Sequence, residues 1–316
     1  MQRQFRLGGG VAPKTTCLRG QSIIEYVLII AVIGLVIVFA GPGVAGAIRN
    51  QFNLVGNTVE NGTNGSAAGG ASGGGTGGAD SATVQAAVAK DAKDWTLDEQ
   101  RAVAEDIAAK GEASPAYAKA KAAMDEGTKW SVKLTNGKTL EYRIIGINHD
   151  DLADGSGKAG ITFEATNDAL DYQRMNATEI TSGGWEKSEL RGRLNSGDLW
   201  SLLPSELQSK VKPVMKVTNN KGGGWAATPS ATTDKVFLLS STEVLGFLDS
   251  DGAQYEYYKS KGVTESNYYG ASSSCCHWTR SVDRRYSTYF HVIGTGGDWG
   301  NNSAAYARPV FPAWCF

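Results

Sequence analysis

The sequence predicts an α+β globular domain that follows a long N-terminal hydrophobic helix, a flexible linker and a short helical segment. Three observations predict this fold class. Residues 27–40 are apolar throughout apart from Gly34, and residues 61–80 consist mainly of Gly, Ser, Ala, Asn and Thr. After Gly127, short apolar runs alternate with turn residues, a pattern that is typical of strands joined by loops.

The apolar segment predicts a helix over residues 21–60. With residues 41–48 it makes a span of about 22 residues, which is long enough to cross a bilayer as a helix. Pro42 and its neighbouring glycines predict a weakened or kinked part of the helix. Apolar residues then recur at helical spacing, so we expect the helix to continue as an amphipathic stem that carries Ile48, Phe52, Val55 and Val59.

Residues 61–81 form the predicted linker, because Gly and Ser offer little surface to bury and leave the chain free. The next segment, residues 82–127, is rich in Ala, Lys and Glu. Thr96 and Glu99 fit a capping box, and Gly111 fits a helix end. We therefore expect two or three short helices there.

Residues 128–316 are predicted to form the α+β domain. Two strand patterns, at 130–134 and 139–147, flank Asn136-Gly137 and predict a hairpin. Further strands are expected at 159–165, 235–240, 276–281, 289–293 and 306–314, and helices near 187–195 and 205–211.

Charge gives no indication of a nucleic-acid partner, because 31 basic residues balance 32 acidic ones. Its distribution is uneven. The first 20 residues include basic residues and no acidic residue, and the remainder is net acidic. A basic leader before an acidic body is typical of an exported chain whose N-terminus stays in the cytoplasm.

One carboxylate, Glu25, stands at the start of the apolar segment, five residues after Gly20. An ionisable group inside a membrane segment costs a few kcal/mol and is usually paired. Cleavage after Gly20 creates a partner, because it leaves an ammonium on Gln21. Glu25 then lies about one helical turn away, where it is able to pair with the ammonium of a neighbouring copy.

The run from Gly20 to Tyr26, with its basic leader and apolar continuation, resembles the type IV prepilins. The Glu25-Tyr26 pair and residues 48–53 resemble specifically the tight-adherence (Flp-type) subclass. The resemblance implies a leader over residues 1–20, cleavage after Gly20, assembly through Glu25, and Tyr26 as a subclass marker. Flp-type pilins are usually much shorter. Gln21 also replaces the methylated Phe of other type IV pilins, so the resemblance leaves methylation open.

The partners implied by this resemblance are other copies of the chain, a prepilin peptidase and the pilus assembly machinery. The precursor would sit in the cytoplasmic membrane, and the mature subunit in an extracellular pilus. Three alternatives stay open: a minor pseudopilin of a secretion system, a membrane-tethered receptor or enzyme that does not polymerise, and an ordinary secretory signal cut near Ala45-Gly46-Ala47.

The C-terminal domain resembles an uncharacterised domain of bacterial surface proteins. The segments that carry the likeness are 142–151, 234–240, 278–281 and 308–310. The last two also resemble the closing strands of the C-type-lectin-like fold, as in formylglycine-generating enzymes. This resemblance implies ligand display more than chemistry.

The sequence offers little catalytic chemistry, and we expect no enzyme activity, no cofactor and no metal. Residues 155–158 lack the first glycine and the Ser/Thr of a phosphate loop. Asp150, Asp151 and Asp154 suggest either a calcium loop or a polar hairpin turn, and the second is favoured because Leu152 occupies a ligand position. His149, His277 and His291 are scattered along the chain.

Residues 281–306 combine aromatic, cationic and small polar residues, a mixture that suits recognition of a glycan or protein ligand. Long loops with their own packed aromatic residues are the alternative interpretation. Trp278 and Trp314 are assigned to the core. The candidate ligand-binding residues are Arg284, Arg285, Tyr286, Tyr289, His291, Asp298, Trp299, Asn301, Asn302 and Tyr306.

Three cysteines remain once a leader containing Cys17 is removed. Cys275 and Cys276 are adjacent and therefore too close to bond easily to each other. We expect Cys315 to pair with one of the two, with neither favoured. Three free thiols are the alternative.

Overall fold

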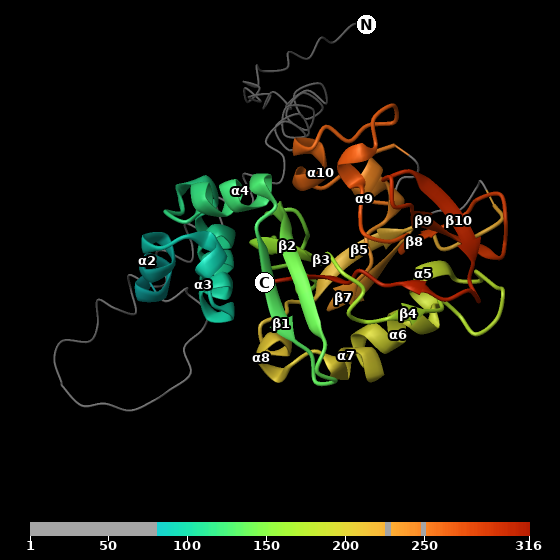
Figure 1. Cartoon of the computed structure of the whole chain (residues 1–316), viewed down its shortest axis with the longest axis horizontal. Helices are drawn as coiled ribbons and strands as arrows, with labels where there is room; N and C mark the ends of the chain where they lie inside the picture. The colour runs from blue at the N-terminus through green and yellow to red at the C-terminus, as the bar shows by residue number, and fades with distance from the viewer. Residues whose placement is uncertain (1–80, 225–228, 248–250) are drawn as a thin grey trace, which may run out of the picture. The chain divides into compact units, whose positions relative to one another are not determined.

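The computed structural model describes residues 81–224, 229–247 and 251–316, which belong to one compact unit (Figure 1). Gly20, Gln21, Glu25, Tyr26 and the linker lie outside the described residues. The described residues cover the helical segment and the α+β domain.

Three helices precede the first strand, as the sequence predicts. They are α2 (Ser81–Ala89), α3 (Leu97–Lys110) and α4 (Tyr117–Glu126), with 3₁₀ turns η1 (Ala92–Asp94) and η2 (Gly111–Ala113) between them. The capping box is confirmed, because Thr96 accepts a hydrogen bond from the Glu99 amide and Glu99 accepts one from the Thr96 amide. Gly127 ends α4 with a φ of 72°, a conformation that glycine adopts without strain.

A five-stranded antiparallel sheet forms the centre of the unit. Its order is β1-β2-β3-β12-β7, so the last strand of the chain lies between β3 and β7. The predicted hairpin is confirmed: the Leu134 amide donates to the Lys138 carbonyl at 2.8 Å, and Gly137 has a φ of 86°. The strands are β1 (Lys129–Lys133), β2 (Thr139–Ile147), β3 (Ile161–Ala165), β7 (Val236–Phe237) and β12 (Ala313–Cys315).

Aromatic side chains fill the space between this sheet and the helices. Phe163 and Trp314 stack at 6.0 Å between ring centroids, and Tyr142 meets both rings edge-on. Trp278 and Trp314 are buried, which confirms their assignment to the core. Helix α3 approaches closely at Gly160, where a Cβ would lie 1.8 Å from the Ala104 carbonyl oxygen, so only glycine fits.

Three smaller sheets complete the fold. The largest has the order β10-β9-β8, with β8 at His277–Val282, β9 at Tyr289–Ile293 and β10 at Trp299–Ser303. The others pair β5 (Val214–Thr218) with β6 (Ser230–Asp234), and β4 (Tyr172–Gln173) with β11 (Arg308–Pro309).

The remaining helices are short. In the view of Figure 1, α9 (Ser241–Leu245) and α10 (Glu256–Ser260) lie at one end of the unit, and α6 to α8 lie at the opposite end. The others are α5 (Gly184–Lys187), α6 (Glu189–Asn195), α7 (Asp198–Leu202), α8 (Ser205–Gln208) and the 3₁₀ turn η3 (Tyr269–Ala271).

Two expectations are corrected. The described residues are α+β, but no helix among them is long and apolar enough to cross a membrane, and the longest, α3, has 14 residues. The long hydrophobic helix is therefore not part of the described fold, and residues 21–60, where we expected it, fall outside it. The strand expected at 235–240 is reduced to β7, because Ser240 forms a capping box with Glu243 that begins α9.

Candidate functional site

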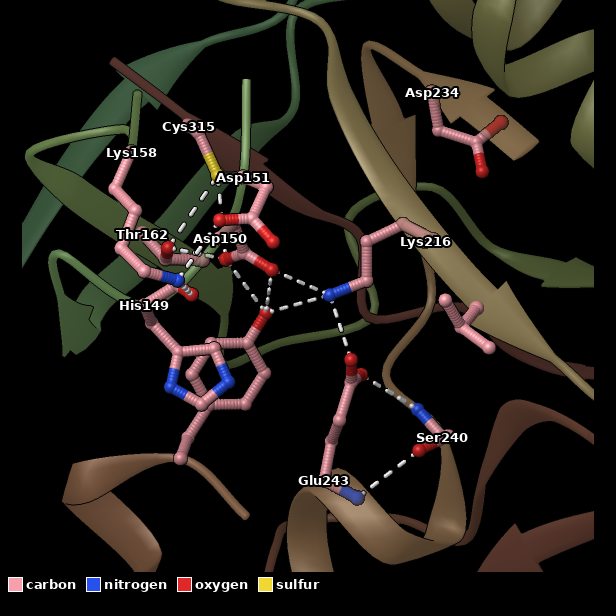
Figure 2. Close-up of polar contacts among 12 residues, drawn as sticks. His149, Asp150, Asp151, Lys158, Thr162, Lys216, Asp234, Ser240, Glu243 and Cys315 are labelled. Atoms are coloured by element: carbon pink, nitrogen blue, oxygen red, sulfur yellow. Dashed lines mark hydrogen bonds and ion pairs between the residues drawn. The ribbon is translucent and has the colours of Figure 1, made fainter. Parts of the chain in front are cut away.

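A network of buried charges joins Asp150, Lys216 and Glu243 (Figure 2). The Lys216 ammonium is 2.6 Å from a carboxylate oxygen of Asp150 and 2.6 Å from one of Glu243. On its other side, Glu243 forms a two-point ion pair with the Arg280 guanidinium. All four side chains are almost completely buried, so the network stabilises the fold and is not accessible to a ligand.

Each member comes from a different element. Lys216 lies on β5, Arg280 on β8 and Glu243 on α9, whereas Asp150 follows β2. Asp150 accepts further hydrogen bonds from Thr162 at 2.6 Å and from Tyr255 at 2.9 Å. The network therefore fixes α9 and β8 relative to the central sheet.

The network remains ionised despite its burial. Burial alone would raise the pKa values of Asp150 and Glu243, but the adjacent cations Lys216 and Arg280 outweigh it and lower both. Burial likewise opposes a charged Lys216, and the two carboxylates raise its pKa. An ion pair of this kind is costly to break, because removing one partner leaves an isolated charge in the interior.

The acidic residues after β2 have three separate roles. Asp150 points into the interior, Asp151 pairs with Lys158 at 3.0 Å, and Asp154 accepts a hydrogen bond from the Ser156 amide. Asp151 and Lys158 also form a bridge across the turn, which confirms the polar hairpin interpretation. Across the described ranges, no group of three or more His, Cys, Asp or Glu side chains is arranged to hold a metal ion.

The sheet β10-β9-β8 carries what we name the aromatic–arginine cluster: Asp283, Arg285, Tyr286, Trp299 and Asn301. The Asp283 carboxylate is buried and accepts hydrogen bonds from the Arg285 guanidinium at 2.9 Å and from the Asn301 amide at 2.6 Å. The guanidinium carbon lies 5.3 Å from the Trp299 ring centroid and 5.6 Å from that of Tyr286. Arg285 and Tyr286 are about half exposed, so a fixed cation and an aromatic ring face solvent together.

His291 and Tyr289 pack against the rings of this cluster. The His291 ring lies 5.3 Å from Trp299, and its Nδ1 is 3.0 Å from the Ser241 hydroxyl on α9. Burial lowers the pKa of His291 to about 4, so the ring is neutral at physiological pH. Tyr289 packs against Tyr286 at 5.2 Å. Through Ser241, the cluster rests on the helix that the buried charge network holds.

The structure therefore brings together six of the ten candidate ligand-binding residues: Arg285, Tyr286, Tyr289, His291, Trp299 and Asn301. The other four have separate positions. Asp298 closes the turn after β9 through its backbone, Asn302 accepts a hydrogen bond from the neighbouring Ser303 amide, Tyr306 is exposed beyond β10, and Arg284 is half-buried beside the cluster.

A second candidate site was missed by sequence reasoning. A pocket of about 310 Å³, which we name the Arg143 pocket, opens between β2, β3, α10 and the segment before β8. Its lining comes from distant parts of the chain, and only the run Ser272-Ser273-Ser274 marks it in the sequence. The residues that define it here are Arg143, Glu164, Thr166, Tyr258, Ser273 and His277.

Residues 156–315, half of the chain, match the family model described as "Domain of unknown function (DUF6273)". The chain belongs to the DUF6273 family. No curated protein and no solved structure matched the chain. None of these comparisons supports the C-type-lectin-like fold that we expected.

The DUF6273 segment contains most residues of the buried charge network, of the aromatic–arginine cluster and of the Arg143 pocket. Lys216, Glu243, Arg280 and the whole aromatic–arginine cluster lie within it, whereas Asp150 and Arg143 precede it. Strands β1 and β2 also precede it, although β2 pairs directly with β3. The folded unit is therefore larger than the DUF6273 segment.

The predicted disulfide is absent from the described residues, where Cys275, Cys276 and Cys315 are free thiols. The reason is strand order. β12 pairs with β3 and β7, whereas β8 pairs with β9, so Cys315 does not face the other two. The Cys315 sulfur instead lies 3.3 Å from the Thr162 hydroxyl, where burial raises its pKa well above the ordinary value.

Proposed function

We propose that the protein is a pilin-type subunit that polymerises through its apolar N-terminal segment and displays the described unit for adhesion. The observation that carries the adhesive part is Arg285, which the buried Asp283 holds against Trp299 and beside the exposed Tyr286. Aromatic rings and arginine dominate binding energies at interfaces. A glycan or a protein surface is the ligand that such a group suits.

Pre-organisation favours recognition over a packing role for this cluster. The Arg285 side chain has two hydrogen bonds to one carboxylate, so a ligand would not have to pay for ordering it. Asp283 also accepts from Asn301 on β10, which links the loop after β8 to the sheet. A ligand would therefore meet a rigid surface.

Sequence alone supports the pilin part. Gly20, Gln21, Glu25 and Tyr26 stand in the order of the type IV prepilins, between a basic leader and an apolar segment. Cleavage after Gly20 would give Glu25 an ammonium partner on the next copy, which offsets the cost of a carboxylate in an apolar segment.

Polymerisation is tested by shearing cells that express the full chain and recovering the released material. We expect the chain in the sheared fraction, with an intact mass that begins at Gln21, bare or with a small modification. Glu25→Ala should leave cleavage intact and deplete the filaments. Glu265→Ala removes an exposed carboxylate far along the chain and serves as the matched control.

Two results would contradict the pilin proposal. A mature chain that begins near Ile48 would indicate an ordinary secretory signal. A correctly cleaved chain that never enters the sheared fraction would indicate a tethered receptor or a minor pseudopilin.

Adhesion is tested with the same cells on a surface coated with a glycoprotein and on its deglycosylated counterpart. Tyr286→Ala should weaken adhesion by about tenfold or more, because an aromatic hot spot contributes roughly 2 kcal/mol. Tyr269→Ala, which removes a 72 % exposed tyrosine from η3, is the control. Equal adhesion by the two variants would contradict a recognition role for the cluster.

A further inference from the structure

The Arg285 guanidinium has one edge that its partner Asp283 does not use. Nε and Nη2 donate to the Asp283 carboxylate at 3.2 and 2.9 Å. A guanidinium has five N–H donors in one plane, so this pairing uses two of them and leaves three on the Nη1 side. The Arg285 side chain is 47 % exposed and that of Asp283 is 1 % exposed. The edge that faces Asp283 is therefore turned inward, and the edge that carries Nη1 is turned toward solvent.

The Asp283 carboxylate has no acceptor position left for a ligand. Oδ1 accepts from the Arg285 amide at 2.7 Å as well as from its Nε. Oδ2 accepts from Nη2 of Arg285 and from the Asn301 amide group at 2.6 Å. Two hydrogen bonds on each oxygen fill the four acceptor sites of a carboxylate. The cluster therefore offers cationic N–H donors to a ligand, and its own carboxylate accepts nothing further.

Tyr286 provides a flat apolar surface beside these donors. It is 49 % exposed, and within the cluster it is the large ring that solvent reaches most. Its ring centroid lies 5.6 Å from the guanidinium carbon of Arg285. One exposed ring is the size of a single sugar ring, whereas a stable interface with another protein buries about 800 Å² on each partner. A sugar is therefore the better match to this surface.

We infer that the aromatic–arginine cluster recognises an anionic glycan, with a carboxylate or sulfate on the free edge of Arg285 and the adjoining sugar ring on Tyr286. The inference rests on the adhesive role proposed above and names its ligand class. The planar fork of an arginine matches two oxygens of such an anion. An anion only accepts hydrogen bonds, as this edge requires. A neutral hydroxyl also donates, and the saturated Asp283 gives it no acceptor.

The experiment measures binding of the full chain, purified in a nonionic detergent without sugar groups, to immobilised polysaccharides. The probes are two pairs: polygalacturonate with its fully methyl-esterified form, and dextran sulfate with dextran. Each pair shares its sugar rings and differs in charge. We expect the charged member of at least one pair to bind about tenfold or more tightly than its neutral counterpart, and the responding pair distinguishes carboxylate from sulfate. Poly-glutamate, which has the charge without the sugar, should bind more weakly.

Arg285→Lys tests the fork, because lysine keeps the charge and loses the planar pair of donors. We expect it to weaken binding of the charged polysaccharide about tenfold, as loss of a charge-assisted hydrogen bond implies. Arg101→Lys is the matched control: Arg101 on α3 is 48 % exposed and its Nε pairs with Glu105 at 3.1 Å. Thermal melts show whether both variants fold.

Three results would overturn the inference: neutral polysaccharides that bind as tightly as the charged ones, poly-glutamate that binds as tightly as the polysaccharides, or equal binding by folded Arg285→Lys and Arg101→Lys. The first two comparisons use the unmodified chain, so they decide the matter even if Arg285→Lys does not fold. The adhesive role fails by a different result, namely adhesion that Tyr286→Ala leaves unchanged. Neutral glycans that bind through Tyr286 would keep the adhesive role and overturn only the anionic ligand.

Discussion

The ammonium nitrogen of Lys216 lies 2.6 Å from Oδ1 of Asp150, and each side chain keeps only 3 % of its surface exposed. The two residues are 66 positions apart in the sequence, on β5 and after β2. This buried ion pair reinforces the backbone hydrogen bonds that join the segment after β2 to β5, although β2 and β5 belong to different sheets.

Lys216→Met should destabilise the protein strongly, because it leaves the Asp150 and Glu243 carboxylates buried without the cation between them. We expect the free energy of unfolding to fall by about 3–5 kcal/mol, as measured by chemical denaturation. Lys133→Met, at an exposed position of β1, should change it by no more than about 0.5 kcal/mol. Similar losses in the two variants would show that the buried pair contributes little.

Asp150 should contribute to acid sensitivity. Lys216 holds the pKa of Asp150 well below its ordinary value of 3.8, despite the opposing effect of burial. The group therefore stabilises the folded state above about pH 4, and this stability is lost as the pH falls toward the lowered pKa.

Asp150→Asn should be less stable than the unmodified chain near pH 7, yet lose less stability between about pH 5 and pH 2. Denaturation midpoints at a series of pH values measure this difference. Parallel curves for the two chains would mean that Asp150 does not titrate as its contacts imply.

Protonation of His291 should reduce the stability of the folded state in a higher pH range than protonation of Asp150 does. Burial lowers its pKa from 6.5 to about 4, with Asp283 opposing the shift and Arg285 favouring it. The folded state thus disfavours the proton that the unfolded chain binds, so stability is lost as the pH falls from about 6.5 to about 4. In thermal melts, His291→Gln should show a smaller loss over this range, and an unchanged loss would contradict the burial of a neutral ring.

The three thiols should differ in reactivity. Cys275 and Cys276 are half-buried and Cys315 is fully buried, so iodoacetamide should label the first two in the folded protein and Cys315 only after unfolding. Peptide mapping without reduction identifies each labelled site. Recovery of Cys315 in a cross-linked peptide would restore the disulfide that we expected from the sequence.

Local patterns in the sequence were reliable where one short segment decides the outcome. Asn136-Gly137 predicted the hairpin, and Thr96 with Glu99 predicted the start of α3. The same pattern is present at Ser240 and Glu243, but the apolar run 236–239 before it predicts a strand that continues through Ser240. For the candidate binding surface, strand pairing explains the partial success: Asn301 is paired with His291 across β9 and β10, whereas Asn302 faces the opposite side.

The sequence does not indicate which side chains far apart along the chain contact one another in the folded protein. Lys216 is one lysine among many, and nothing near it indicates two buried carboxylates or the arginine beyond them. The Arg143 pocket depends in the same way on segments that meet only in the folded chain. The disulfide prediction was wrong for this reason, because adjacency of β12 to β8 was assumed and the sheet places β12 elsewhere.

The position of β12 between β3 and β7 sets the order of events during synthesis. β12 is made after every other described strand, yet it occupies an interior place in the sheet, with Trp314 fully buried. Until the ribosome has made residues 313–315, β3 lacks its partner on one edge, and β7 lacks the strand with which it pairs in this sheet. An interrupted chain therefore exposes two strand edges and an open core, and it is a substrate for chaperones or for aggregation, not a slightly weakened version of the finished protein.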